Sequence, residues 1–132
     1  MPTSSHVIPV LVYEDLQRAH DFLVEVFGLT AGFVHRDGDG NAVHAEVRAG
    51  ETTIWLHRAT AEHRLAPPRA LGPTQHGGLV VHVDDVDAHF RGVRDSGRAT
   101  IDGEPSDKPY GQRDYGVRDL EGHRWWFGTP LA

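Results

Sequence analysis

Residues 10–29, VLVYEDLQRAHDFLVEVFGL, hold the pattern from which the expected fold of the whole chain follows. Residues 6–13 form an apolar run typical of a buried strand, and Asp15 stands where a helix N-cap is expected. Beyond it, apolar residues recur at helical spacing: Leu16, Ala19, Phe22, Leu23, Val26 and Phe27. Gly28 is a typical helix end. The stretch therefore predicts a strand followed directly by an amphipathic helix.

The residues that follow complete a first structural unit. They contain short strand candidates, separated by turn signals, at residues 32–36, 42–50 and 52–58. Residues 1–58 therefore predict a β-α-β-β-β module.

The same order of elements recurs in the second half of the chain. Residues 59–77 are rich in Pro and Gly and predict a linker. Residues 78–132 then predict a strand, a capped helix, a strand over residues 99–105 and two closing strands. Ala19-His20 recurs as Ala88-His89, and Gly28 recurs as Gly97 at the same separation. An internal repeat explains this pattern, and it predicts an α+β fold of two modules in one structural domain.

The composition excludes several classes of protein. The 132 residues contain no cysteine, which excludes disulfides and thiolate chemistry and makes a reducing, cytoplasmic location the expectation. The net charge of −6 argues against a nucleic-acid partner and favours a neutral or cationic small molecule. No apolar run approaches the roughly 20 residues of a membrane span, and the N-terminal residues lack a secretory signal pattern.

Two adjacent tryptophans lie on the last predicted strand, in residues 119–128, DLEGHRWWFG. Neighbouring side chains of a strand point to opposite faces of its sheet. We expect Trp125 and Phe127 to face the helices and belong to the core. Trp126 must then face the other way.

Three stretches resemble the vicinal oxygen chelate superfamily, also called the glyoxalase, bleomycin resistance protein and dioxygenase superfamily. They are residues 10–29, residues 82–90 (HVDDVDAHF) and residues 115–130 (YGVRDLEGHRWWFGTP). The start and end of the chain are most similar to bleomycin-resistance-type binding proteins. The resemblance implies that the paired modules form a curved mixed sheet with a concave cleft. It also implies a homodimer, in which the modules can be swapped between chains.

Metalloenzymes of this superfamily hold a divalent metal with four side chains, one from the first and one from the last strand of each module. In this chain the four positions correspond to Ile8, Trp55, Gly78 and Trp126. None of these side chains coordinates a metal. We therefore expect no metal, no cofactor and no catalytic residue of that kind.

The resemblance also indicates which residues line the cleft. Trp55 and Trp126 occupy equivalent positions and offer indole surfaces on which a flat or hydrophobic ligand can stack. His57 and His82 share the cleft side of their strands and are candidates to hydrogen-bond a ligand or to act as acid or base. For most of the other histidines, including His20 on the first helix, we expect exposure to solvent.

Two further segments supply candidate ligand contacts. In residues 42–50 the apolar residues alternate with His44, Glu46 and Arg48, so His44 and Glu46 are predicted on the cleft side. The loop of residues 107–115 is a predicted rim, with Tyr110 as an aromatic lip and Asp114 as an anionic contact.

Two functions remain open from the sequence. The first is non-catalytic binding and sequestration of a hydrophobic or aromatic small molecule, an antibiotic, as in drug-resistance proteins. The second is an enzyme of the same superfamily, a lyase, isomerase or dioxygenase-like protein. It would work without a metal through His57, His82 or Glu46, or with atypical metal ligands. Because the side chains at the four metal-ligand positions cannot coordinate a metal, the sequence favours the first function.

Overall fold

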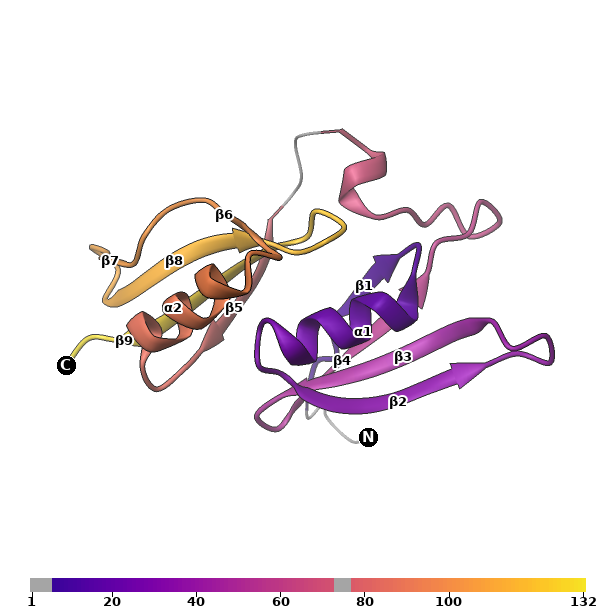
Figure 1. The fold of residues 1–132 in the computed structure, drawn as a ribbon, viewed down its shortest axis with the longest axis horizontal. Helices are drawn as coiled ribbons and strands as arrows, with labels where there is room; N and C mark the ends of the chain where they lie inside the picture. Colours follow the sequence, from indigo (N-terminus) through magenta and orange to yellow (C-terminus); the bar gives the residue numbers. More distant parts are fainter. Residues whose placement is uncertain (1–5, 73–76) are drawn as a thin grey trace, which may run out of the picture.

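The computed structural model describes residues 6–72 and 77–132 and shows two units, each with one helix packed on one sheet (Figure 1). The first unit contains β1 (Val10–Tyr13), α1 (Leu16–Glu25), β2 (Thr30–Arg36), β3 (Ala42–Ala49) and β4 (Thr52–Arg58). The second contains β5 (Gly78–His82), α2 (Val86–Ser96), β6 (Thr100–Ile101), β7 (Ser106–Asp107), β8 (Gln112–Arg118) and β9 (Arg124–Pro130). A single 3₁₀ turn, η1 (Pro68–Ala70), lies between the units. It starts at a proline because the fixed φ of proline suits the first position of a helical turn.

The two sheets have the same strand order. The first runs β1-β4-β3-β2 and the second β5-β9-β8-β6, with β7 paired to β8. In each sheet the first strand pairs in parallel with the last, and the other pairs are antiparallel. The predicted α+β fold with mixed sheets is thereby confirmed. The sheets are separate, because the described strands β1 and β5 do not pair with each other.

One predicted strand is much shorter than expected. Residues 99–105 form only the two-residue strand β6, and a second short strand, β7, follows it. Gly103 and Pro105 explain the break, since glycine disfavours extended pairing and proline has no N–H to donate to the ladder. This segment therefore runs along β8 as an interrupted edge, paired at Thr100–Ile101 and again at Ser106–Asp107.

Both helices begin at an aspartate N-cap, the first at the predicted Asp15. The side chain of Asp15 accepts a hydrogen bond from the backbone N–H of Arg18 at 3.0 Å, and Asp85 accepts one from Ala88 at 3.0 Å. Each bond satisfies an N–H that the first turn of a helix leaves unpaired. The second helix ends at Gly97 with a φ of 65°, a left-handed conformation that glycine adopts without strain.

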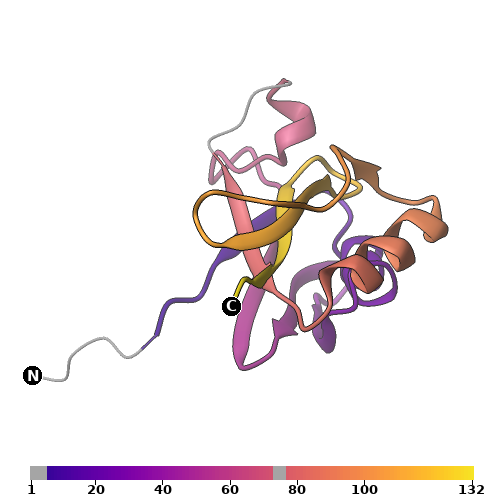
Figure 2. The ribbon, with the colours of Figure 1, turned by 90° about the vertical axis from the view of Figure 1, so that its left-hand side faces the viewer.

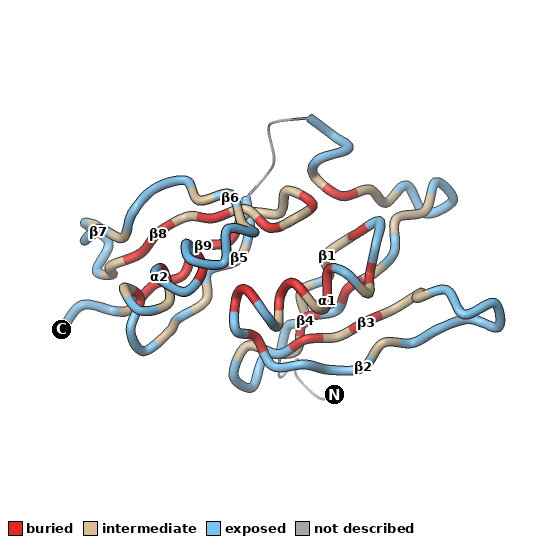
Figure 3. Tube along the Cα trace, in the orientation of Figure 1, coloured by how far each residue is buried: buried red, intermediate tan, exposed pale blue. Residues whose placement is uncertain are grey.

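A shared aromatic core joins the two units. Trp125 and Phe127 are fully buried on the helix side of β9, and both contact Phe27 beyond α1, at ring distances of 5.5 and 5.1 Å. Figure 3 shows the buried residues along the helices and central strands, whereas β2 is mostly exposed. Trp126, which lies between these two residues in the sequence, is only half-buried. The predicted opposite orientations of Trp125 and Trp126 are confirmed.

Buried hydrogen bonds between the units surround the turn that precedes β9. Asp119 accepts hydrogen bonds from the Tyr13 hydroxyl at 2.5 Å and from the Trp125 indole N–H at 3.1 Å. Glu121 accepts from the backbone N–H groups of Glu14 and Asp15 at 2.6 and 3.0 Å. The second unit therefore holds the point at which β1 of the first unit turns into α1.

A histidine forms a further bridge between the units. His89 on α2 donates from Nε2 to the carbonyl oxygen of Phe27 at 2.7 Å and accepts at Nδ1 from the Tyr115 hydroxyl at 2.7 Å. Burial lowers its pKa below the ordinary 6.5, although the hydrogen bond to Phe27 opposes this effect. The neutral imidazole is therefore part of the folded structure.

The expected exposure of the histidines is wrong for His20. Its side chain is buried, and Nε2 accepts a hydrogen bond from the backbone N–H of Gly32 at 3.3 Å. The helix packs here against the adjoining β2, a contact that helical spacing alone does not reveal.

Within the described residues, no helix has the length and apolar character needed to cross a membrane.

Trp125→Ala should lower the free energy of unfolding by about 3 to 5 kcal/mol, the usual cost of removing a large aromatic side chain from a packed core. Trp126→Ala should cost much less, because this indole lies on the other side of β9. Urea denaturation followed by circular dichroism measures both. A larger loss for Trp126→Ala would contradict the register of β9.

The stability of the protein should decrease as the pH falls through the titration range of histidine. His89 has a lowered pKa when folded, so the unfolded chain binds its proton first and stability is lost from about pH 6.5 downward. His89→Gln should flatten this part of the stability curve, measured by denaturation between about pH 5 and 8. The exposed His63→Gln is the control, and an unchanged curve in His89→Gln would refute the assignment.

Candidate ligand-binding site

Each sheet has one face that no helix covers, here called its open face. Figure 2 shows both helices on the same side of the sheets. Trp55 lies on the first open face, 40% exposed, between Val10 of β1 and Glu46 of β3. Trp126 lies on the second open face, between Val80 of β5 and Gly116 of β8. The two indoles thus occupy equivalent places in the repeat.

The first open face brings its four predicted residues together. The ring of His44 meets Trp55 edge-on at 5.2 Å, and its Nε2 lies 2.9 Å from the Glu46 carboxylate. His57 is paired directly with His44 across β3 and β4, and its Nδ1 lies 2.7 Å from the carbonyl oxygen of Arg58. All four side chains are accessible from one side of the sheet.

Two aromatic residues of this face were not among the predicted ones. Phe33 and His35 on β2 stack at 4.6 Å, and His35 lies 5.8 Å from His44. Val34 between them packs against the core. Because side chains alternate along a strand, this valine would have indicated that both neighbours face outward. The row of rings extends from Trp55 across three strands.

The second open face contains a cavity of about 420 Å³ beside Trp126. The indole lies against the backbone of Gly116, where an added Cβ would come within 3.3 Å of its Nε1. The guanidinium of Arg124 lies 5.9 Å from the centre of the Trp126 rings. Asp102 pairs with Arg124 at 3.8 Å and with Arg118 at 3.0 Å, so it holds one wall of the cavity.

Asp114 forms the opposite wall, not the rim that we expected. It lies on β8 with 2% of its side chain exposed. Its carboxylate accepts hydrogen bonds from the Tyr110 hydroxyl and from Gln112 Nε2, both at 2.7 Å, and pairs with Lys108 at 3.4 Å. Burial by itself would raise the pKa of the Asp114 carboxyl, but these partners together bring it below the ordinary 3.8. The group is therefore an ionised acceptor.

Tyr110, predicted as an aromatic lip, lines the same cavity with 68% of its surface exposed. It lies on a tight turn closed by the hydrogen bonds of Lys108 N–H to Gln112 O at 2.8 Å and Gly111 N–H to Lys108 O at 3.1 Å. Gly111 has a φ of 93°, which the turn requires and which side chains other than glycine disfavour. The hydrogen bond to Asp114 raises the pKa of Tyr110. The turn and the hydrogen bond to Asp114 therefore hold the Tyr110 ring in place.

His82 lies on the same open face and contacts the side-chain amide of Gln112. It is exposed on β5, and its Nε2 lies 3.0 Å from Oε1 of Gln112. Gln112 reaches it by crossing Gly128, where an added Cβ would lie only 2.8 Å from the amide nitrogen. A hydrogen-bonded chain therefore runs from His82 through Gln112 to Asp114.

A metal does not fit the positions that hold it in related enzymes. Ile8, Trp55 and Trp126 carry no coordinating atom, and a side chain at Gly78 would come within 1.8 Å of the Arg124 carbonyl oxygen. Among the residues that the structure describes, no group of three or more His, Asp or Glu side chains is arranged to hold a metal ion. We derive no chemistry through a metal here.

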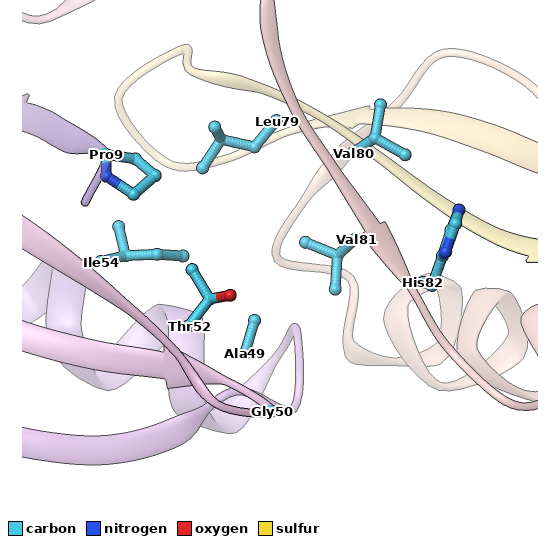
Figure 4. A pocket seen from close by; sticks show the side chains of 9 residues that line it. All are labelled: Pro9, Ala49, Gly50, Thr52, Ile54, Leu79, Val80, Val81 and His82. Atoms are coloured by element: carbon cyan, nitrogen blue, oxygen red, sulfur yellow. The ribbon is translucent and has the colours of Figure 1, made fainter. Parts of the chain in front are cut away.

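A second pocket lies between the two units (Figure 4). It has a volume of about 310 Å³ and is mainly apolar, with Pro9 and Ile54 on one side and Leu79 and Val81 on the other. The sequence did not indicate it, because it forms where two sheets approach without pairing. It does not include either exposed indole.

The comparisons with known proteins agree with this fold. TioX from Micromonospora sp. ML1 is 37% identical, with a TM-score of 0.76 and coverage of 97% of this chain and 100% of that one. TnmS3, an antibiotic binding protein from Streptomyces sp. CB03234, is 24% identical, with a TM-score of 0.73 and coverage of 98% and 99%. The bleomycin-binding protein from Streptomyces verticillus, solved with copper(II)-bleomycin, is 20% identical, with a TM-score of 0.67 and full coverage of both chains. The last two show the fold alone.

A search of curated proteins finds no match. The family model described as Glyoxalase/Bleomycin resistance protein/Dioxygenase superfamily matches residues 4–127. This range includes the first helix–sheet unit, the second unit as far as Phe127 in β9, and both Trp55 and Trp126. The chain therefore belongs to the glyoxalase, bleomycin resistance protein and dioxygenase superfamily, as its sequence motifs predicted.

Proposed function

We propose that the protein binds and sequesters an aromatic or hydrophobic small molecule, an antibiotic, without catalysing a reaction. The observation that carries this proposal is the pair of indoles at equivalent positions on the two open faces. Trp55 is 40% exposed and Trp126 is half-buried beside a cavity, and neither is needed to fill the core that Trp125 already fills. A large rigid ring in such a place supplies contact area to a ligand at low entropic cost.

The chemistry around the indoles supports binding over catalysis. Two carboxylates that line the cavity beside Trp126 are paired with cations, Asp102 with Arg124 and Asp114 with Lys108, whereas Glu104 has no ion pair among the described residues. Carboxylates held by cations in this way are less available to act as a nucleophile or general base than free ones. The name of TnmS3, an antibiotic binding protein of the same fold, also supports this assignment.

We further propose a homodimer in which the first open face of one chain and the second open face of its partner enclose a common cleft. Figure 2 shows no helix over either open face. Large apolar side chains are exposed there and along the free edges of the sheets: Val10 (52%), Phe33 (54%), Trp55 (40%) and Val80 (57%). A second copy of the chain would cover these side chains and the unpaired edges of β1 and β5.

Replacing either indole should weaken ligand binding and leave the fold intact. With 2,6-dihydroxyanthraquinone as the probe, Trp126→Ala and Trp55→Ala should each reduce the affinity about thirtyfold, equivalent to about 2 kcal/mol of lost stacking and burial. Quenching of the remaining tryptophan fluorescence measures the affinity, and circular dichroism checks the fold. Leu71→Ala, at an exposed site away from both open faces, is the control. Unchanged affinity in both tryptophan variants would refute an aromatic cleft.

Light scattering at micromolar concentration should give a mass near twice the 14.6 kDa of one chain. Val80→Asp should shift the equilibrium toward the monomer, because a carboxylate in an apolar interface loses its hydration without gaining a partner. Leu71→Asp is the matched control. A wild-type monomer would remove the composite cleft from the proposal, while binding of a probe to each open face would still be measurable.

A further inference from the structure

The three histidines on the open faces are held in defined tautomers. His57 Nδ1 lies 2.7 Å from the carbonyl oxygen of Arg58, and a carbonyl oxygen only accepts hydrogen bonds. His44 Nε2 lies 2.9 Å from the carboxylate of Glu46, which in its ionised form also only accepts. These two nitrogens therefore carry the proton of the neutral ring.

For His82 the tautomer follows from Asp114. Asp114 is an ionised, buried carboxylate, so Gln112 must direct its NH₂ group toward it, at 2.7 Å. The other end of the amide, Oε1, then faces His82 Nε2 at 3.0 Å and accepts its proton. Gly128 leaves the space through which the amide passes.

In the neutral form of each ring, the second nitrogen is then an acceptor. In the described part of the chain, no hydrogen bond is made by Nδ1 of His44, Nε2 of His57 or Nδ1 of His82. Two of the nearby donors, Lys108 and Tyr110, bind Asp114. Within the described residues, the indole N–H groups of Trp55 and Trp126 make no hydrogen bond, and Nε of Arg124 lies 3.8 Å from Asp102 without bonding to it, so donors are present beside these acceptors. Arg48 is a further donor, and it lies at the turn end of β3, beyond the row formed by His44 and His57.

We propose that the open faces recognise their ligand by accepting hydrogen bonds, so the ligand is an aromatic ring system that carries O–H or N–H donors. His82 Nδ1 is the principal contact on the second open face, and Gln112 is its positioning residue. The inference rests on the proposed binding function and names the chemical class that it selects. A site built to pair with donors discriminates against analogues that lack them, because its acceptors then lose water without gaining a partner.

The premise can be tested on the full-length ¹⁵N-labelled protein by long-range ¹H–¹⁵N correlation of the imidazole rings. We expect the proton on Nε2 of His44 and His82 and on Nδ1 of His57. Gln112→Lys replaces the accepting amide oxygen by an ammonium group, which only donates, so His82 should change to the Nδ1–H tautomer. Gln17→Lys, on α1, introduces the same charge away from the open faces and should leave all three tautomers unchanged. A wild-type His82 protonated at Nδ1 would overturn the inference.

Recognition itself is tested with 2,6-dihydroxyanthraquinone and its 2,6-dimethoxy counterpart, which share a ring system but differ in donors. Wild type should bind the dihydroxy probe at least about tenfold more tightly, as expected for one or two hydrogen bonds. Gln112→Lys should remove most of this preference by weakening the dihydroxy probe, and Gln17→Lys should keep it. Equal affinities in wild type, or an unchanged preference in Gln112→Lys, would overturn the inference. If the two probes bind equally and the binding of each depends on Trp126, the proposed binding function stands and the donor preference is refuted. If neither probe binds, the proposed function and the donor preference are both refuted.

Discussion

The buried carboxylate of Asp119 is the constraint on which the rest of the structure depends. It accepts hydrogen bonds from Tyr13 of the first unit and from the Trp125 indole of the second, and its other oxygen accepts the backbone N–H groups of Glu121 and His123. Burial, followed by the charge and hydrogen bond of Asp119, raises the pKa of Tyr13 well above its ordinary value, so the hydroxyl remains a donor. Removing one partner would leave a buried polar group unsatisfied, at a cost of about 1 to 3 kcal/mol.

The turn that contains Asp119 also determines which side chain of β9 lies on the second open face. With the Trp125 indole N–H held on Asp119 and its ring against Phe27, the helix side of β9 is defined, and Trp126 must lie on the other side. A shift of one residue would bury Trp126 and expose Trp125. The hydrogen bonds that stabilise the core and the surface proposed for ligand binding therefore have a common origin. The same holds in weaker form for β4, where Ile54 and Leu56 are buried and Trp55 faces out.

The open faces combine aromatic surface with polar groups whose orientations are set by their neighbours. On the second face, two strands and a turn contribute to one chain of contacts, from His82 through Gln112 to Asp114 and Tyr110. Gly116 and Gly128 leave space for this arrangement. Gly116 allows the Trp126 indole to lie against the backbone, and Gly128 allows the Gln112 amide to pass over β9. Neither glycine needs an unusual backbone angle, so both are explained by space. A preorganised arrangement of this kind limits the entropy lost when a ligand binds.

Local properties of the chain accounted for most of the elements, the helix cap at Asp15, and the opposite sides on which Trp125 and Trp126 lie, because alternation and capping depend only on residues near in sequence. They could not place Asp114, which looked like part of a loop, nor reveal that His20 is buried. Those outcomes depend on which strand or helix lies alongside. The tautomer of His82 and the cavity beside Trp126 likewise exist only once β5, β8 and β9 are adjacent, since each needs atoms brought together from distant parts of the chain.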